Sequence, residues 1–128
     1  MEKENQEFLF KLGIFEQQIR QIQQQINAVE EGIVELGILN LGLDDLKNSD
    51  GKEMLAPVGR GIFVKSKIIS EELTVDIGQK TFVKKSIPQT QEVIKEQLER
   101  LEEAKMELNN NLEEIGRELE NVMKESQK

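Results

Sequence analysis

The chain of 128 residues contains no cysteine, no histidine, no tryptophan and no tyrosine. Without cysteine, disulfides are excluded, and without histidine as well, zinc sites of the usual ligand types and histidine-based catalysis are excluded too. Only five phenylalanines are present, so a large globular core would lack its usual aromatic filling. We therefore expect no catalytic residues, no metal site and no cofactor.

Positive charge is also scarce. The chain has 17 basic and 25 acidic residues, which gives a formal net charge of -8. Nucleic acids and anionic membranes attract basic surfaces, so neither is expected as a main partner. No apolar run approaches the length of a membrane span. Residues 1–5 lack a basic stretch followed by an apolar run, so no secretory signal is expected. A disulfide-free acidic chain of this kind suits the cytoplasm.

The period of the apolar pattern changes twice along the chain. It is two in the middle, over residues 53–86, and alternates between three and four on both sides, which marks strands between helices. The length suits one domain, residues 1–128. The sequence predicts an α+β fold: a helix at about 8–46, two β-hairpins at about 53–86, and a helix at about 87–125. The two helices would form a long antiparallel intramolecular coiled coil.

The first helix carries a heptad seam, with steps of four and three that continue without a miss. The seam consists of Phe8, Leu12, Phe15, Ile19, Ile22, Ile26, Val29, Ile33 and Leu36. Towards residue 46 the apolar residues surround the helix rather than line one side of it. A helix that is apolar on most sides is buried on most sides, so the strands or another subunit should cover this end.

The strand block, residues 53–86, divides into strands at about 53–58, 61–68, 73–77 and 81–85. The sequence predicts tight hairpin turns at Gly59–Gly61 and Gly78–Lys80. It also predicts that Leu73, Val75 and Ile77 share one face of their strand. Two hairpins leave strand edges open, and about 34 residues with one modest apolar face form a poor core. We expect these edges to pair with strands of other subunits. The alternative is a self-contained four-stranded sheet.

The second helix should begin at Ser86, which can cap it while Gln89 completes a capping box and Pro88 occupies the first turn. Its seam includes two polar residues, Gln91 and Lys105, of the kind that fix register. The seam runs through Ile87, Gln91, Ile94, Leu98, Leu101, Lys105, Leu108, Leu112, Ile115, Leu119 and Val122. Antiparallel pairing places Phe8 near Val122, so both termini should meet at one tip, about 55 Å from the strands at about 1.5 Å per residue.

No motif for enzyme chemistry is present. Gly59–Gly61 lacks the glycine spacing of a dinucleotide fingerprint and the lysine of a P-loop, and it lies between strands rather than before a helix. The carboxylates of the second helix are too many and too evenly spread to mark a catalytic pair. The sequence therefore favours an interaction protein over an enzyme.

The order of parts, together with Leu55–Gly61 and Val75–Gly78, resembles the alpha-type subunit of prefoldin, a chaperone of archaea and eukaryotes. Two hairpins indicate the alpha type, because beta-type subunits carry one. The resemblance implies a hexamer of two alpha and four beta subunits, in which the hairpins join a double β-barrel. It also implies coiled-coil tips that hold unfolded proteins and deliver them to a group II chaperonin without ATP hydrolysis.

Two sets of residues follow from this resemblance. The residues expected to contact unfolded clients at the tip are Phe8, Leu9, Phe10, Leu12, Leu119, Val122 and Met123. The residues expected to form the assembly hub are Leu55, Pro57, Val58, Gly59, Gly61, Ile62, Val64, Leu73, Val75, Ile77, Gly78 and Phe82. The alternative function is a structural coiled-coil homo-oligomer or filament, built through the hairpins.

Overall fold

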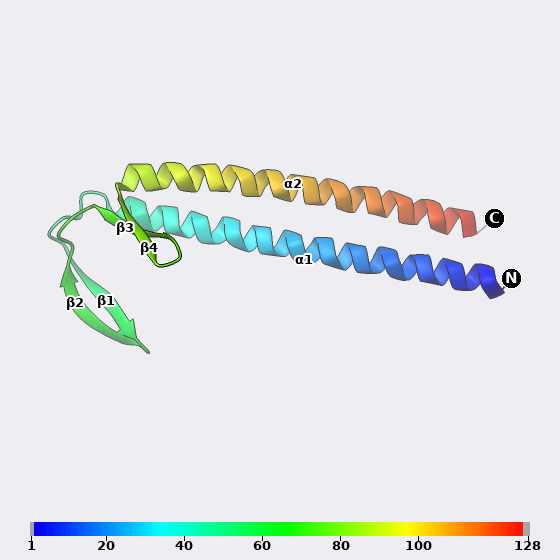
Figure 1. Ribbon diagram of the computed structural model, residues 1–128, viewed down its shortest axis with the longest axis horizontal. Coiled ribbons are helices and arrows are strands. Elements are labelled where there is room, and N and C mark those ends of the chain that lie inside the picture. Colours follow the sequence, from blue (N-terminus) through cyan, green and yellow to red (C-terminus); the bar gives the residue numbers. More distant parts are fainter. Residues whose placement is uncertain (1, 127–128) are drawn as a thin grey trace. The chain divides into compact units, whose positions relative to one another are not determined.

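The computed structural model describes residues 2–126 and has the predicted order of elements (Figure 1). The elements are α1 (Glu2–Leu46), β1 (Glu53–Gly59), β2 (Ile62–Lys67), β3 (Leu73–Gly78), β4 (Thr81–Lys85) and α2 (Ile87–Ser126). Helix α1 begins at Glu2 rather than near residue 8. Its first turn contains Glu2 and Glu4, and acidic residues there are favoured by the helix dipole.

The chain forms two compact units. The first consists of Met1–Val34 with Glu99–Lys128, and the second of Glu35–Leu98. The first unit therefore contains parts of α1 and α2 alone. The second contains the other parts of both helices and all four strands.

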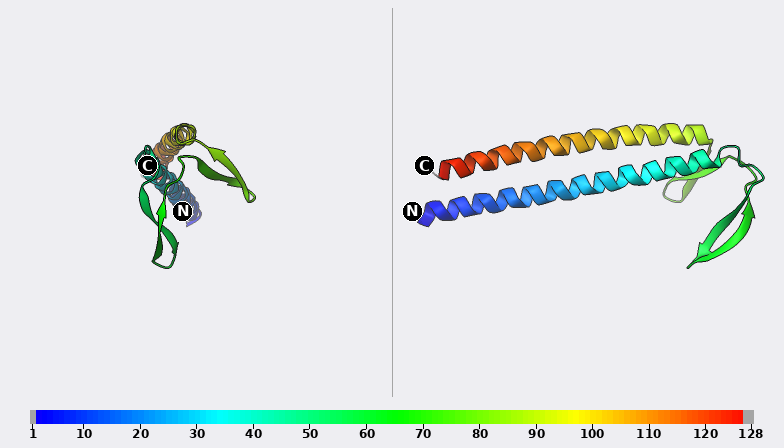
Figure 2. Two further views of the ribbon diagram at one scale, coloured as in Figure 1. Left: turned by 90° about the vertical axis from the view of Figure 1, so that its left-hand side faces the viewer. Right: turned by 180° about the vertical axis from the view of Figure 1, so that it is seen from behind.

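In the first unit the two helices pack along a seam one layer deep. Every predicted apolar seam residue there is half-buried, and the residues between them are nearly all exposed. This alternation confirms the heptad reading of both helices. The amino and carboxyl ends of the helices lie at the same end of the pair (Figure 2).

Two features of the first unit determine how the helices pack at the seam. Lys105 Nζ lies 3.5 Å from Glu30 Oε1 on the facing helix, which explains how a lysine is accommodated in the seam. A Cβ atom at Gly32 would lie 3.3 Å from Leu101 Cδ1, so the missing side chain lets the helices approach closely there. A half-exposed ion pair contributes about 0.5 kcal/mol, and its main effect is on register.

The second unit contains the most deeply buried apolar side chains that the structure describes. Leu43, Ile87 and Ile94 are 6%, 2% and 3% exposed. Partly buried residues pack around them: Leu36, Leu46, Leu73 and Leu98. The capping box is confirmed, because Gln89 N donates to Ser86 Oγ at 3.2 Å and Ser86 N donates to Gln89 Oε1 at 3.1 Å.

The four strands form two separate antiparallel hairpins, β1–β2 and β3–β4, and not one sheet (Figure 2). The self-contained four-stranded sheet, which the sequence left as an alternative, is therefore wrong. Each strand has one paired edge and one open edge. Open edges of this kind are available for pairing with other chains.

Candidate functional site

The two hairpins share one turn design. In both, the two central turn residues have positive φ: Arg60 (47°) and Gly61 (77°) in the first, Gln79 (51°) and Lys80 (60°) in the second. This is the geometry of a type I′ turn, whose twist matches that of the flanking strands. Both predicted turns are thus confirmed, and each carries one cationic side chain.

A β-bulge precedes each turn. In the first hairpin Pro57 pairs with Phe63 and Gly59 with Ile62, which leaves Val58 without a partner across the ladder. In the second, the pairs Asp76–Phe82 and Gly78–Thr81 leave Ile77 in the same position. The glycine after each unpaired residue has positive φ, 144° at Gly59 and 108° at Gly78, which explains why glycine stands there.

The bulge corrects one expectation about the second hairpin. Leu73 and Val75 are half-buried, whereas Ile77 is 59% exposed, so the three do not share one buried face. The register shift between Asp76 and Gly78 interrupts the alternation before it reaches the turn. Val58, at the matching bulge of the first hairpin, is 69% exposed.

Hairpin β1–β2 exposes apolar side chains on both of its faces. Leu55 and Phe63 lie on one face and are 61% and 56% exposed. Ile62 and Val64 lie on the other and are 63% and 51% exposed. A two-stranded ribbon is marginally stable by itself, and exposed apolar side chains on both of its faces make each face a candidate interaction surface.

Hairpin β3–β4 differs, because one of its faces is half-buried. Cross-strand pairing places Leu73 with Lys85 and Val75 with Val83, and all four are partly covered. Leu73 packs against the core of the second unit. Phe82, on the other face, is 59% exposed. This hairpin therefore has one face anchored within the chain and one face free.

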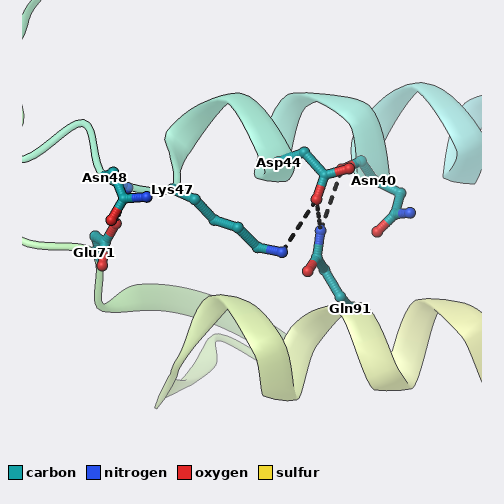
Figure 3. A network of polar contacts seen from close by, with 6 residues as sticks. All are labelled: Asn40, Asp44, Lys47, Asn48, Glu71 and Gln91. Atoms are coloured by element: carbon teal, nitrogen blue, oxygen red, sulfur yellow. Dashed lines mark hydrogen bonds and ion pairs between the residues drawn. The ribbon is translucent and has the colours of Figure 1, made fainter.

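A polar network joins the two helices beside the hairpins (Figure 3). Gln91 Nε2 donates to Asp44 Oδ1 at 2.7 Å and to the Asn40 carbonyl at 3.5 Å, and Lys47 Nζ lies 3.3 Å from Asp44 Oδ1. The Gln91 hydrogen bond, followed by Lys47, lowers the pKa of Asp44 below its ordinary value. Asn48 N donates to the Glu71 carboxylate.

Gln91 was predicted as a polar seam residue, and the structure shows that it donates hydrogen bonds to the facing helix α1. Asn40 and Asp44 were missed. The signal for Asn40 was available, because the seam continues from Leu36 to Asn40 and Leu43 with steps of four and three. Within residues 2–126, Asn40 Oδ1 is a buried acceptor without a hydrogen-bond partner.

The apolar end of α1 is not covered as a whole. Ile38 and Leu41 are 65% and 67% exposed, while Leu43 and Leu46 face the core. The sequence suggested that either the strands or another subunit would cover this end of α1, and the strands do not cover Ile38 and Leu41. Another subunit remains as the expected cover.

The predicted tip residues separate into two groups. Four lie half-buried in the seam: Phe8, Leu12, Leu119 and Val122. The other three are exposed, Leu9 by 64%, Phe10 by 71% and Met123 by 47%. A groove of about 460 Å³ opens beside them, lined by Glu4, Asn5, Glu7, Phe8, Lys11, Val122 and Glu125. The tip thus combines apolar side chains with a mostly acidic rim.

The described part of the chain shows neither a metal-binding cluster nor a membrane-spanning helix. Among residues 2–126 no group of acidic side chains is arranged to hold a metal ion. None of the described helices combines the length and apolarity that crossing a bilayer requires.

Comparison with known proteins gives the chain its family. The family Prefoldin subunit matches residues 15–128, which is most of the sequence. The chain belongs to the prefoldin family. The chain is of the archaeal alpha type, as its relatives are, and this agrees with the resemblance seen in Leu55–Gly61 and Val75–Gly78. Prefoldins are non-enzymatic chaperones, in agreement with the expectation that the chain is not an enzyme.

Several curated relatives carry the name prefoldin subunit alpha. The one from Methanobrevibacter smithii is 37% identical over 97 residues, which cover 75% of this chain and 66% of the relative. Prefoldin subunit alpha 1 of Methanocaldococcus jannaschii is 29% identical over 91 residues, which cover 71% of this chain and 63% of the relative. The matched part spans slightly less than two thirds of these relatives.

A solved structure supports the fold. A chain of filamentous prefoldin from Methanocaldococcus jannaschii superposes with a TM-score of 0.79 at 22% identity, covering 89% of this chain and 96% of that one. The arrangement of two antiparallel helices with two hairpins between them is therefore a prefoldin fold.

Proposed function

We propose that the chain is a subunit of an ATP-independent chaperone that assembles with other subunits through its hairpins and holds unfolded proteins with its helix tip. The proposed assembly contains two alpha and four beta subunits, forms a β-barrel from their hairpins, acts in the cytoplasm and delivers clients to a group II chaperonin. The observation that carries it is the exposure of apolar side chains at two places, the hairpins and the tip.

The hairpins support the assembly part. Both are two-stranded, and β1–β2 is bare on both faces. Exposed ribbons of this kind gain stability only when other strands extend the ladder and cover the side chains. Family membership supplies the partner, since relatives are named as subunits.

The tip supports the client-binding part. Leu9, Phe10 and Met123 are exposed on the helix surface and do not contribute to the seam. An apolar side chain that becomes fully buried contributes about 1.5–3 kcal/mol, and partial burial gives less. Each tip would bind weakly, and several tips on one assembly would raise the effective concentration without a specific pocket.

The tip assignment is tested with Leu9→Ser and Phe10→Ser together. Because neither residue lies in the seam, helix content by circular dichroism should stay unchanged. Suppression of aggregation of a chemically denatured client by the assembled complex should fall several-fold. The matched control is Val34→Ser with Met106→Ser, two side chains of the first unit that are 60% and 66% exposed but lie outside the tip. Equal suppression by both variants would show that the tip does not hold the client.

A second candidate is a structural filament of this chain alone. It is favoured by the open edges of both hairpins and by the solved relative, which is a filamentous prefoldin. Native mass of the purified chain, with and without a beta-type subunit, separates the two proposals. A large homopolymer that is indifferent to the beta-type subunit would favour the filament.

A further inference from the structure

The charge of the chain is unevenly distributed. Residues 47–86, between the two helices, contain eight basic and five acidic side chains, whereas the rest of the chain contains nine basic and twenty acidic ones. The segment that carries the hairpins thus has an excess of positive charge within a chain whose net charge is -8. Overall composition conceals this basic segment.

Ion pairs within the segment neutralise only some of its cations. Lys65 Nζ lies 3.9 Å from Glu53 Oε2, and Lys84 Nζ lies 3.6 Å from Glu72 Oε1. Within residues 2–126, five cations of this segment have no carboxylate within 4 Å. They are Lys52, Arg60, Lys67, Lys80 and Lys85.

Four of these cations lie on the hairpins: Arg60, Lys67 and Lys80 are exposed, and Lys85 is half-buried. Arg60 and Lys80 occupy the central positions of the two turns. Lys67 lies on the same face of β1–β2 as Leu55 and Phe63, and Lys85 pairs with Leu73 across β3–β4. We call Arg60, Lys67, Lys80 and Lys85 the hairpin cations. Apolar surface interspersed with unpaired cations is the pattern of a protein interface whose partner supplies the anions.

We propose that the hairpins bind a partner subunit whose own hairpin presents carboxylates towards Arg60, Lys67, Lys80 and Lys85. This inference rests on the assembly role proposed above and adds the chemistry of the partner. A nucleic acid is the less favoured occupant, because Leu55, Ile62, Phe63 and Val64 would have no apolar counterpart on it. A second copy of the chain would bring the hairpin cations together.

Opposite charge at an interface acts chiefly on the rate of association, and that effect weakens as salt screens it. Association with an acidic partner should therefore slow with added salt. Association of the chain with itself should instead strengthen with salt, because screening relieves the repulsion between like charges.

The test uses the full chain and the beta-type prefoldin subunit of the organism that encodes it. Association rates are measured by stopped-flow fluorescence between 50 and 500 mM NaCl. For the unaltered chain we expect a fall on the order of tenfold over this range. The reversed variant carries four substitutions together: Arg60→Glu, Lys67→Glu, Lys80→Glu and Lys85→Glu. It should associate on the order of tenfold more slowly at 50 mM NaCl, and the salt dependence of its association rate should be flattened or reversed.

The matched control reverses four exposed helix cations instead: Lys11→Glu, Arg20→Glu, Lys95→Glu and Arg117→Glu. It changes the net charge by the same amount and should alter the rate less than threefold. Circular dichroism of both variants confirms that the helices are intact. Equal slowing by the two variants would show that net charge acts and that the hairpin cations are not the contact.

A mixing experiment gives a second measurement that needs no partner subunit. The reversed variant carries carboxylates on its hairpins, so it should associate with the unaltered chain at 50 mM NaCl more strongly than either does with itself. Absence of this preference would overturn the proposal, as would self-association of the unaltered chain that weakens with salt. Binding of a fluorescent single-stranded DNA, lost in the reversed variant while subunit association is unchanged, would identify a nucleic acid instead.

The two proposals fail in different ways. If the chain forms no complex with the beta-type subunit at any salt concentration, the assembly role is wrong. If the complex forms at a rate that neither salt nor charge reversal changes, the assembly role stands and the acidic partner surface is wrong.

Discussion

The two hairpins have the same bulge and the same turn, but they differ in what covers them. Hairpin β3–β4 rests one face against the chain's own core through Leu73, whereas β1–β2 is exposed on both faces. The same turn geometry therefore occurs in one hairpin that is anchored and in one that is free. The difference teaches that turn geometry does not determine whether a hairpin is covered by its own chain, because the covering depends on packing against the core.

The largest effect is expected from making the free hairpin polar. Leu55→Thr with Phe63→Thr removes apolar area from one face of β1–β2 while keeping strand propensity. Assembly with a beta-type subunit, measured as native mass, should be abolished at micromolar concentration, and the unfolding of the chain alone should change little. The matched pair in the anchored hairpin is Ile77→Thr with Phe82→Thr, which should weaken assembly less. A greater loss from the second pair would reverse the comparison.

The next effect concerns the anchor. Leu73→Ala should destabilise the chain alone by roughly 1–2 kcal/mol, less than the 2–5 kcal/mol typical of a fully buried leucine, because Leu73 is only partly covered. Leu55→Ala, in the free hairpin, should cost under about 0.5 kcal/mol, as surface substitutions usually do. Urea unfolding followed by circular dichroism measures both. Equal costs would mean that β3–β4 is not anchored through Leu73.

The shared bulge gives a third, smaller effect. Gly78→Ala and Gly59→Ala should each destabilise their hairpin by about 1 kcal/mol, because alanine is strained at the positive φ of both positions. A Cβ atom would meet nothing within 4 Å at either glycine, so only the backbone is affected. Urea unfolding should detect the change at Gly78, in the hairpin coupled to the core. At Gly59 the change should appear only as weaker assembly.

The smallest effect should come from Asp44, next to the anchored hairpin. Its pKa is lowered in the folded chain by Gln91 and then Lys47, so the stabilisation is present above about pH 4, the ordinary value for aspartate, and is lost as the pH falls through the lowered pKa. In Asp44→Asn this part of the acid dependence should disappear. Thermal melts of both chains between pH 2.5 and 6 measure the difference, and parallel curves would contradict it.

Most of the fold could be predicted from the sequence, because short local patterns of residues determine its helices and their ends. The steps of four and three from Phe8 to Leu36 define a seam by themselves, and Ser86 with Gln89 marks the start of α2. The bulge at Ile77 was not predicted, and the bulge at Val58 was signalled only by Pro57, which cannot donate to a ladder and therefore belongs on an edge or at a bulge. The exact positions of both bulges were not predicted. They depend on which residues face each other across the hairpin, and alternation within one strand carries no information on that.

The candidate surfaces were predicted less completely. The exposed apolar residues of β1–β2 follow from strand propensity, but the sequence did not show that β3–β4 alone would be anchored. That contact joins Leu73 to Leu43, Ile87 and Ile94, which are distant in sequence. The network of Asn40, Asp44 and Gln91 was only partly visible for the same reason, since Asp44 lies outside the seam and takes part through a hydrogen bond from the other helix.

The one-layer seam of the first unit has a consequence for how the helix pair opens. Because no side chain between Glu2 and Val34 is fully buried, each pair of turns is held mainly by its immediate neighbours, as in a zipper. Such a structure frays from its ends without unfolding as a whole. Amide hydrogens near Phe8 and Val122 should therefore exchange faster than those near Ile26, in a gradient along the helices. Each turn that frays would release further apolar side chains beside Phe10. Under the client-binding role proposed above, the reach of the tip would then adjust to the size of the bound protein.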